Sequence, residues 1–330
     1  MEIRSWFPIP TYRCPWPYDT PSRQTPWAPT STTAKDSQPR LSVPTTGKFS
    51  DLKLIQLMKN SSSISILPLL GFLLFTSLTH AQQAGKMKLV WADEFNGNSL
   101  DYSKWGVEEN ALGGGNNEMQ AYRWNKKNLR VEGGNLVIEA HKDSPNMAGT
   151  VKPYSSGRIR SKLRGDWTYC RVDVRAKLPI GQGIWPAIWM LPTDERYGGW
   201  ASSGEIDIME LVGHEPSTYH GTLHYGGGWP KNHHSGDKYK LPSGTFADDF
   251  HVFSIFWEKG KITWGIDGKT WQTQQKWSSD KAPFPAPFDQ RFHLVLNLAV
   301  GGRWPGNPDA STKFPAKMLV DYVKVYQRTK

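Results

Sequence analysis

Residues 253–274 read Phe-Ser-Ile-Phe-Trp-Glu-Lys-Gly-Lys-Ile-Thr-Trp-Gly-Ile-Asp-Gly-Lys-Thr-Trp-Gln-Thr-Gln. Three short runs, Phe253 to Trp257, Ile262 to Ile266 and Thr270 to Gln274, alternate around turns at Lys259-Gly260 and Asp267-Gly268. Alternation with a period of two is typical of β-strands, and glycine after a charged residue is typical of the tight turns that join them. The stretch therefore predicts a three-stranded antiparallel meander.

The same pattern continues on both sides of the meander. A hairpin is expected where Leu129 to Glu132 and Leu136 to Ala140 flank Gly133-Gly134-Asn135. Further strand-type runs at Phe292 to Val300 and Met318 to Tyr326 bring the chain to its end. Many short strands without long amphipathic helices or a repeat of fixed length predict an all-β fold, a β-jelly-roll sandwich of two antiparallel sheets.

The first 81 residues are expected to lie outside this domain, which we place at residues 86–328. Residues 1–57 are rich in Pro, Thr and Ser and have no hydrophobic period, so we expect a disordered extension. Residues 58–81 resemble a secretory signal peptide, because a basic start precedes an apolar stretch and the small-x-small sequence Thr79-His80-Ala81. Such signals act from an extreme N-terminus, which suggests that translation starts at Met58.

Cleavage near Ala81 would give a secreted protein, extracellular or periplasmic. The alternative is a membrane anchor behind a cytoplasmic tail. A stable anchor is disfavoured because the apolar run is short and is broken by Pro68 and Ser77. No cysteine follows the run, so a bacterial lipid anchor is not expected either.

Composition limits the class of partner. The formal net charge is +10, but Lys and Arg are scattered among acidic residues and form no stripe, so no nucleic-acid partner is expected. Cys14 and Cys170 lie in segments that are not expected to share a mature molecule, which leaves no disulfide framework. The 16 Trp exceed what a core usually needs, and indole rings suit either a sandwich core or stacking on sugars.

The segment Gly204-Glu-Ile-Asp-Ile-Met-Glu210 carries three carboxylates on an apolar strand-type run. Strand alternation places Glu205 and Asp207 on one face, but it would put Met209 there instead of Glu210. A β-bulge at Ile208-Met209 would return Glu210 to that face, and bulges often re-aim side chains beside active sites. The alternative is that the segment has no catalytic function and is an ordinary strand whose charged face is exposed to solvent. Its apolar neighbours disfavour that alternative.

Paired carboxylates on one face fit glycoside hydrolysis. A retaining glycosidase needs its two carboxyl groups about 5–5.5 Å apart, whereas the Cα atoms of Glu205 and Glu210 would be separated by more than ~10 Å along a strand. Long side chains leaning inward would close that gap. The Asp207 carboxylate between them would raise the proton affinity of both by like-charge repulsion, as a general acid requires.

The sequence resembles glycoside hydrolase family 16, in the bulged form found in its bacterial laminarinases. The resemblance covers residues 88–327 and rests on the segment above and on four further motifs: Gly183-Ile-Trp-Pro-Ala-Ile-Trp-Met-Leu-Pro192, Trp91-Ala-Asp-Glu-Phe-Asn-Gly97, Gly221-Thr-Leu-His-Tyr-Gly226 and Asn297-Leu-Ala-Val-Gly-Gly302. One departure is Trp200-Ala-Ser-Ser203, where many laminarinases have Trp-Pro-Ala-Ser. The resemblance implies a jelly roll with a concave substrate cleft.

The resemblance also implies roles for individual residues. Glu205 would be the nucleophile, Glu210 the general acid and base, and Asp207 the residue that tunes both, with no cofactor for catalysis. Substrate contacts would come from the following residues: Trp185, Trp189, Trp200, Asn110, His224 and Arg158. Trp185 would otherwise be plain core and His224 a structural histidine. Either Arg158 or Arg160 would face the cleft.

Members of the family often carry a structural calcium on the convex side. Asp321 matches the usual carboxylate ligand, with backbone carbonyls near Glu94 and Gly134 completing a set of hard oxygen donors.

Two other motifs do not support a site. The histidines between His214 and His234 suggest zinc, but they lack the His-Glu-x-x-His spacing. Gly113-Gly-Gly115 lacks the lysine of a phosphate loop and is expected to be a flexible turn.

These observations favour a monomeric, retaining endo-β-1,3-glucanase acting on laminarin-like or mixed-linkage β-glucan. One alternative is a β-glucan-binding protein without hydrolysis, which the intact Glu205, Asp207 and Glu210 disfavour. The other is a galactanase of the same family, an agarase or carrageenase, which the motifs between Gly183 and Gly226 disfavour.

Overall fold

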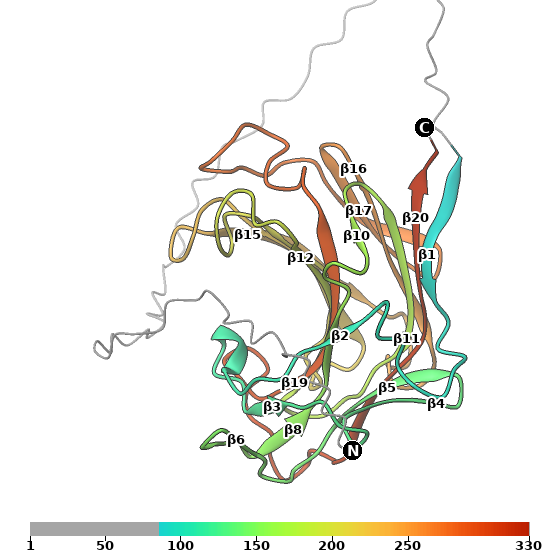
Figure 1. Cartoon of the computed structure of the whole chain (residues 1–330), viewed down its shortest axis with the longest axis vertical. Helices are drawn as coiled ribbons and strands as arrows, with labels where there is room; N and C mark the ends of the chain where they lie inside the picture. Colours follow the sequence, from blue (N-terminus) through green and yellow to red (C-terminus); the bar gives the residue numbers. More distant parts are fainter. Residues whose placement is uncertain (1–85, 330) are drawn as a thin grey trace, which may run out of the picture. The chain divides into compact units, whose positions relative to one another are not determined.

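The computed structural model describes residues 86–329 of the chain. Two eight-stranded antiparallel sheets stack face to face, with β1, β11 and β20 in one layer and β12, β15 and β19 in the other (Figure 1). The only helix among the described residues is a single 3-10 turn, Gly113–Gly115 (η1). The predicted all-β sandwich is confirmed, while the N-terminal extension and the signal peptide lie outside the described residues.

Sheet A has the order β18-β17-β16-β11-β20-β5-β4, with β1 also pairing with β20. Its strands are β1 (Met87–Asp93), β4 (Leu129–Glu132), β5 (Asn135–Ala140), β11 (Arg171–Lys177), β16 (His251–Glu258), β17 (Lys261–Ile266), β18 (Lys269–Gln274) and β20 (Ala316–Arg328). The predicted meander is β16-β17-β18, and the predicted hairpin is β4-β5. Gly133 and Gly134 turn the hairpin with φ of +59° and +73°, a conformation that disfavours side chains with a Cβ.

Sheet B has the order β15-β14-β13-β12-β19-β9-β2, with β10 also pairing with β19. Its strands are β2 (Gly106–Val107), β9 (Arg158–Arg160), β10 (Asp166–Trp167), β12 (Ile184–Pro192), β13 (Glu205–Glu210), β14 (Thr218–Tyr225), β15 (His233–Lys240) and β19 (Phe292–Val300). Two small pairs lie outside the main sheets: β3 (Gln120–Tyr122) with β8 (Tyr154–Ser156), and β6 (Asn146–Met147) with β7 (Thr150–Val151).

A single hydrophobic core lies between the sheets and includes side chains from nearly every long strand. Sheet A contributes alternate residues such as Val172 and Val174, and sheet B contributes Ile188 and Met190. Cys170 is buried in this core. Since one face of sheet B is committed to the core, its polar and aromatic side chains gather on the outer face, with β13 in the middle of the sheet.

Candidate active site

The acidic residues of β13 share the outer face of sheet B because the strand contains a β-bulge. Asp207 and Met209 pair with consecutive residues of β12, so Ile208 has no partner there. The register against β14 also shifts, between Asp207 and Glu210. Ile208 and Met209 are both buried in the core, while Glu205 and Glu210 remain partly exposed. The predicted bulge is confirmed, and it restores Glu210 to the side of Glu205.

Glu205 is held by an indole and an imidazole. Trp200 Nε1 donates a hydrogen bond of 2.9 Å to Glu205 Oε2. His224 Nε2 lies 3.7 Å from Glu205 Oε1 and 3.3 Å from Asp207 Oδ2, and its ring centroid is 5.7 Å from that of Trp200. The Glu205 side chain is 14% exposed, and that of Asp207 only 2%. The structure thus brings all four of these predicted residues together.

Glu210 has its own indole partner. Trp185 Nε1 donates a hydrogen bond of 3.1 Å to Glu210 Oε1, so this largely buried tryptophan is more than core filling. Trp304 packs edge-on against Trp185 at 5.4 Å and against His220 at 5.0 Å between ring centroids, yet is 42% exposed. Sequence reasoning missed Trp304. The available signal was its place in a Gly- and Pro-rich turn directly after β19.

Burial sets the protonation of the three carboxyl groups. It raises the pKa of Glu205 and of Glu210 to about 8, and the Asp207 charge adds to both increases. His224 opposes the rise at both residues, as do the indole N–H groups. Burial also raises the pKa of Asp207 well above its usual range. The cluster can therefore present a protonated carboxyl beside an ionised one near neutral pH.

Arg158 of β9 and Trp189 of β12 stack on each other in the sheet that carries the carboxyl groups. Trp189 Nε1 donates a 2.7 Å hydrogen bond to Asn297 Oδ1, and the Arg158 guanidinium lies 4.9 Å above the Trp189 ring. Glu108 approaches both Arg158, at 2.9 Å, and Arg160, at 3.1 Å. Arg158 and Arg160 are two residues apart on β9 and share one face, and of the two only Arg158 stacks on Trp189; its contact with substrate stays a prediction.

Asn110 lies at the border of this region. Its backbone pairs with Tyr122, and its side-chain Oδ1 accepts a hydrogen bond from the Leu112 N–H. Within residues 86–329 its hydrogen bonds serve the local loop and do not reach the carboxyl groups. Its predicted contact with substrate stays a prediction.

The strand register of sheet A places the residues predicted to bind calcium along one edge of β20, and the calcium site itself stays a prediction. The edge of β20 pairs with β5 up to Val320 and with β1 from Val323 onward, which leaves Asp321 at the change of partner. Glu94 directly follows β1 and Gly134 directly precedes β5. Asp321 Oδ2 accepts a 2.6 Å contact from Arg175 Nη1, so part of its charge is already compensated. The register suits the predicted oxygen donors.

Glu205, Asp207 and His224 each hold one oxygen or nitrogen within 4.8 Å of the others, a spacing that a cation could also bridge. Burial raises the pKa of Glu205 and of Asp207, so these carboxyl groups tend to hold protons near neutral pH. The donor set therefore fits proton transfer better than metal binding.

The chain matches the model of the family "Glycosyl hydrolases family 16" over residues 116–324. It is 48% identical to glucan endo-1,3-beta-glucosidase A1 of Niallia circulans over 73% of this chain, which spans 38% of that relative. It is 40% identical to a beta-glucanase of Rhodothermus marinus, covering 75% of this chain and 87% of the relative. The catalytic domain of an endo-1,3-beta-glucanase (laminarinase) from Thermotoga petrophila has a similar structure, with a TM-score of 0.67, 36% identity, and coverage of 74% of this chain and all of that one.

Proposed function

The chain belongs to glycosyl hydrolases family 16, and from that premise we propose that it hydrolyses β-1,3-glucosidic bonds within laminarin-like or mixed-linkage β-glucan chains. The observation that carries the proposal is the bulged strand β13, which presents Glu205 and Glu210 on one face, each bound by an indole N–H. Two of the relatives reported above are named as endo-1,3-beta-glucan hydrolases and one as a beta-glucanase, and the intact pair of carboxyl groups supports hydrolysis over binding alone.

The surroundings of the two glutamates suggest different roles. His224 lies 3.7 Å from Glu205, and no such ion pair joins it to Glu210 in the described part of the chain. The Trp200 N–H adds a hydrogen bond of 2.9 Å. Both contacts favour the ionised form of Glu205, which suits a nucleophile. Glu210 also accepts an indole N–H, from Trp185, but His224 lies in ion-pair distance of Glu205 and not of Glu210, so Glu210 is the better candidate for the protonated general acid.

The reaction would proceed in two steps with retention of configuration. In the first, a Glu205 oxygen forms a bond to the anomeric carbon while the bond between the anomeric carbon and the glycosidic oxygen breaks. Glu210 donates its proton to the departing glycosidic oxygen. In the second, Glu210 takes a proton from water, whose oxygen displaces Glu205. Asp207 lies between them and keeps the proton affinity of both high. No cofactor takes part.

The aromatic residues on either side would bind the glucan. Trp200 lies beside Glu205, and Trp185 with Trp304 lies beside Glu210, so sugar rings on both sides of the cleaved bond would meet an indole. Trp189 of β12, with Arg158 stacked on its ring, would contact the glucan on the side of β13 that faces β12.

Three further features stay proposals. The residue pattern before position 82 supports export through a signal peptide, and no helix among the described residues is long and apolar enough to cross a membrane. The register around Asp321, with the backbone near Glu94 and Gly134, supports a structural calcium that would join β20 to its two edge partners. We also propose that the enzyme acts as a monomer.

The test is reducing-sugar release from laminarin by the purified protein and by Glu205→Gln, with lichenan, agarose and carrageenan as comparison substrates. We expect the protein to cleave laminarin and the variant to lose the activity by a factor of at least ~10³. Binding of laminarin without cleavage would favour a glucan-binding protein, and cleavage of agarose or carrageenan alone would favour a galactanase.

The two roles are separated by an aryl β-glucan oligosaccharide with a leaving group that needs no proton. Because bond cleavage then requires only the nucleophile, Glu210→Gln should still release the aryl group in a first turnover, whereas Glu205→Gln should not. Equal loss in both variants would contradict the assignment.

A further inference from the structure

A pocket of about 500 Å³ lies at one end of the sandwich, where loops of both sheets meet. Its walls come from the residue before β11, the β12-β13 loop, the β16-β17 turn and the segment before β19. Two of these four segments belong to sheet A, so the pocket lies apart from the site on the outer face of sheet B. The side chains that define its chemistry are Tyr169, Arg196, Tyr197, Lys259, Phe284 and Asp289.

Two exposed cations line the pocket, Arg196 and Lys259. Within residues 86–329 neither of them lies within ion-pair distance of a carboxylate, and Glu258, directly before Lys259, pairs instead with Lys261 at 2.8 Å. The Arg196 guanidinium lies 5.4 Å from the centroid of the Tyr197 ring. An anion in the pocket would gain the planar fork of the arginine and the point charge of the lysine.

The pocket also contains a carboxylate that can accept further hydrogen bonds. Tyr197 OH donates to Asp289 and lies 2.8 Å from Oδ1 and 3.0 Å from Oδ2. Burial raises the pKa of Tyr169 and of Tyr197, and the Asp289 charge adds to both increases, so both hydroxyl groups keep their protons. Because an ionised carboxylate has about four acceptor positions, Asp289 can also bind a hydroxyl group of a ligand.

Phe284 gives the pocket a flat apolar wall. Its ring packs against Trp277 with 5.0 Å between centroids and is still 51% exposed. A Cβ on Gly260 would lie 2.9 Å from Phe284 Cε1, so the glycine lets the ring approach the β16-β17 turn. Tyr169 adds a second ring, packed edge-on against Trp257 at 5.5 Å. Aromatic walls of this kind suit the apolar face of a sugar ring.

The backbone around the pocket is strained and firmly held. Tyr169 has a φ of +58°, and Glu195, directly before Arg196, has a φ of +48°, a region that residues with a Cβ rarely occupy. The Arg196 backbone N–H donates a 2.9 Å hydrogen bond to Gln290 Oε1, and the buried Gln290 amide donates to the Ser203 carbonyl. Strained residues fixed by buried contacts are typical of ligand sites, so the walls are preformed.

We propose that this pocket binds one anionic sugar unit, a uronate or a sugar sulfate. Arg196 and Lys259 bind the anionic group, Asp289 accepts a hydrogen bond from a hydroxyl group, and the ring stacks on the aromatic wall. A neutral sugar would leave both cations without a partner, and inorganic sulfate would leave the carboxylate and the aromatic wall unused.

The pocket has a consequence for where the protein is retained. The three carboxyl groups of β13 disfavour an anionic sugar at the catalytic face, so the two sites select different polymers. The pocket holds the protein on an acidic polysaccharide while the catalytic face stays open to neutral glucan. The inference goes beyond the proposed function and does not depend on it, because the pocket shares no residue with the catalytic cluster.

The experiment measures, by ligand-observed NMR, the binding of methyl β-glucuronide and glucose 6-sulfate to the full chain. Methyl β-glucoside is the neutral probe and inorganic sulfate the probe without a sugar. A ligand of about 14 non-hydrogen atoms with ordinary efficiency has a Kd of about 1 mM, and we expect at least one anionic sugar to reach it. The tighter of the two shows whether the pocket prefers a carboxylate or a sulfate.

Arg196→Ala and Lys259→Ala should each weaken the binding of the anionic sugars about fivefold to tenfold, because each removes one charge-assisted contact in an open pocket. Lys269→Ala is the matched control, since it removes the same charge from an exposed position at the start of β18. The control should keep the affinity of the unmodified protein.

Equal affinity of the two pocket variants and the control, or no binding of either anionic sugar, would overturn the pocket assignment. Inorganic sulfate that binds as tightly as glucose 6-sulfate would overturn the recognition of a sugar. An affinity for methyl β-glucoside that falls in Arg196→Ala as far as that for the glucuronide would overturn the selection of an anion. Thermal unfolding of each variant identifies a loss that comes from misfolding, and Arg196→Gln then replaces Arg196→Ala.

Discussion

The buried carboxyl groups should lower the free energy of unfolding as pH rises. Glu205→Gln should remove the part of this decrease that comes from Glu205. Folding raises the pKa of Glu205 from 4.5 to about 8, mainly through burial. Below pH 4.5 the carboxyl is protonated in both states and costs nothing. Between pH 4.5 and 8 the unfolded chain ionises while the folded one does not, so the free energy of unfolding falls as pH rises.

The structure sets the magnitude. Each tenfold change in proton affinity corresponds to about 1.4 kcal/mol, so the full shift to a pKa of about 8 corresponds to about 5 kcal/mol. Glu205 keeps 14% exposure and accepts the Trp200 N–H, so water and the indole can relieve part of the cost on ionisation. We therefore expect Glu205→Gln to gain about 2–3 kcal/mol over the unmodified protein at pH 8 and about 0.5 kcal/mol at pH 5.

The assay is thermal unfolding of both proteins at several pH values from 5 to 8. For a domain of this size, 1 kcal/mol shifts Tm by about 2–4 °C, so the variant should melt about 4–12 °C higher at pH 8 and about 1–2 °C higher at pH 5. Glu258→Gln is a control of opposite sign, because hydrogen bonds from Lys261 and Arg328 lower the pKa of Glu258. A difference between Glu205→Gln and the unmodified protein that stays constant or shrinks as pH rises would refute the reasoning.

Three further perturbations test other parts of the site. Trp200→Phe removes a hydrogen bond that lowers the pKa of Glu205, so the acidic limb of the pH profile of kcat/KM should move to higher pH, with a loss of about tenfold at pH 7; an unmoved limb would argue against Glu205 as the nucleophile. Trp304→Ala should raise KM for laminarin about threefold to tenfold with little change in kcat, and an unchanged KM would exclude Trp304 from substrate binding. Calcium at about 100 times its Kd should stabilise the protein by about 2.7 kcal/mol over a chelated sample, and Asp321→Ala should abolish that gain; equal Tm with calcium and with chelator would remove the calcium proposal.

Much of the fold could be predicted because its signals are local. The meander of β16, β17 and β18 follows from alternation and two glycine turns, and the β4-β5 hairpin follows from Gly133-Gly134. The bulge was also predictable, since only an extra residue reconciles Glu205 and Glu210 on one face with a buried Ile208. Each inference needed no more than 22 consecutive residues, the length of the stretch from Phe253 to Gln274.

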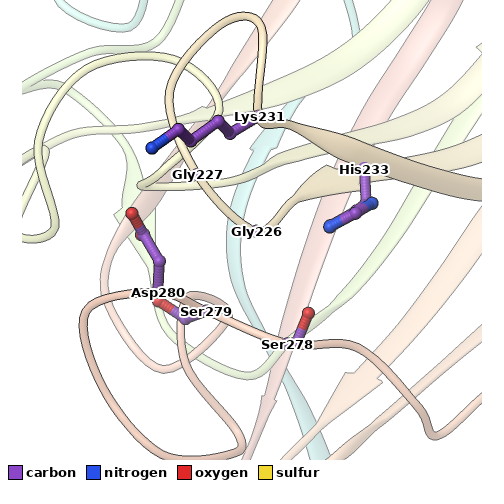
Figure 2. A pocket seen from close by; sticks show the side chains of 7 residues that line it. All are labelled: Gly226, Gly227, Lys231, His233, Ser278, Ser279 and Asp280. Atoms are coloured by element: carbon purple, nitrogen blue, oxygen red, sulfur yellow. The ribbon is translucent and has the colours of Figure 1, made fainter.

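The remainder depends on contacts between segments far apart in the chain. Trp304 follows β19 and meets Trp185 of β12, and that pairing depends on the order of strands in the sheet. The stacking of Arg158 on Trp189 joins β9 to β12, about thirty residues further on, and alternation within β9 alone does not define it because Arg158 and Arg160 share one face. Another example is the small polar pocket where residues 278–280 lie beside the β14-β15 loop, a proximity recorded by the bridge between Gly226 and Ser279 (Figure 2).

The bulge also changes the parity of β13. Before it, even-numbered residues such as Ile206 are buried; after it, odd-numbered residues such as Met209 and Leu211 are. Loss of one residue at the bulge would restore simple alternation and still leave both carboxyl groups on the outer face, whereas loss of one residue elsewhere in the strand would turn one of them into the core. The strand can thus lose a residue at the bulge without turning its core-facing side chains outward. Each such change alters the distance between the Cα atoms of Glu205 and Glu210 by about 3.3 Å while the core stays intact.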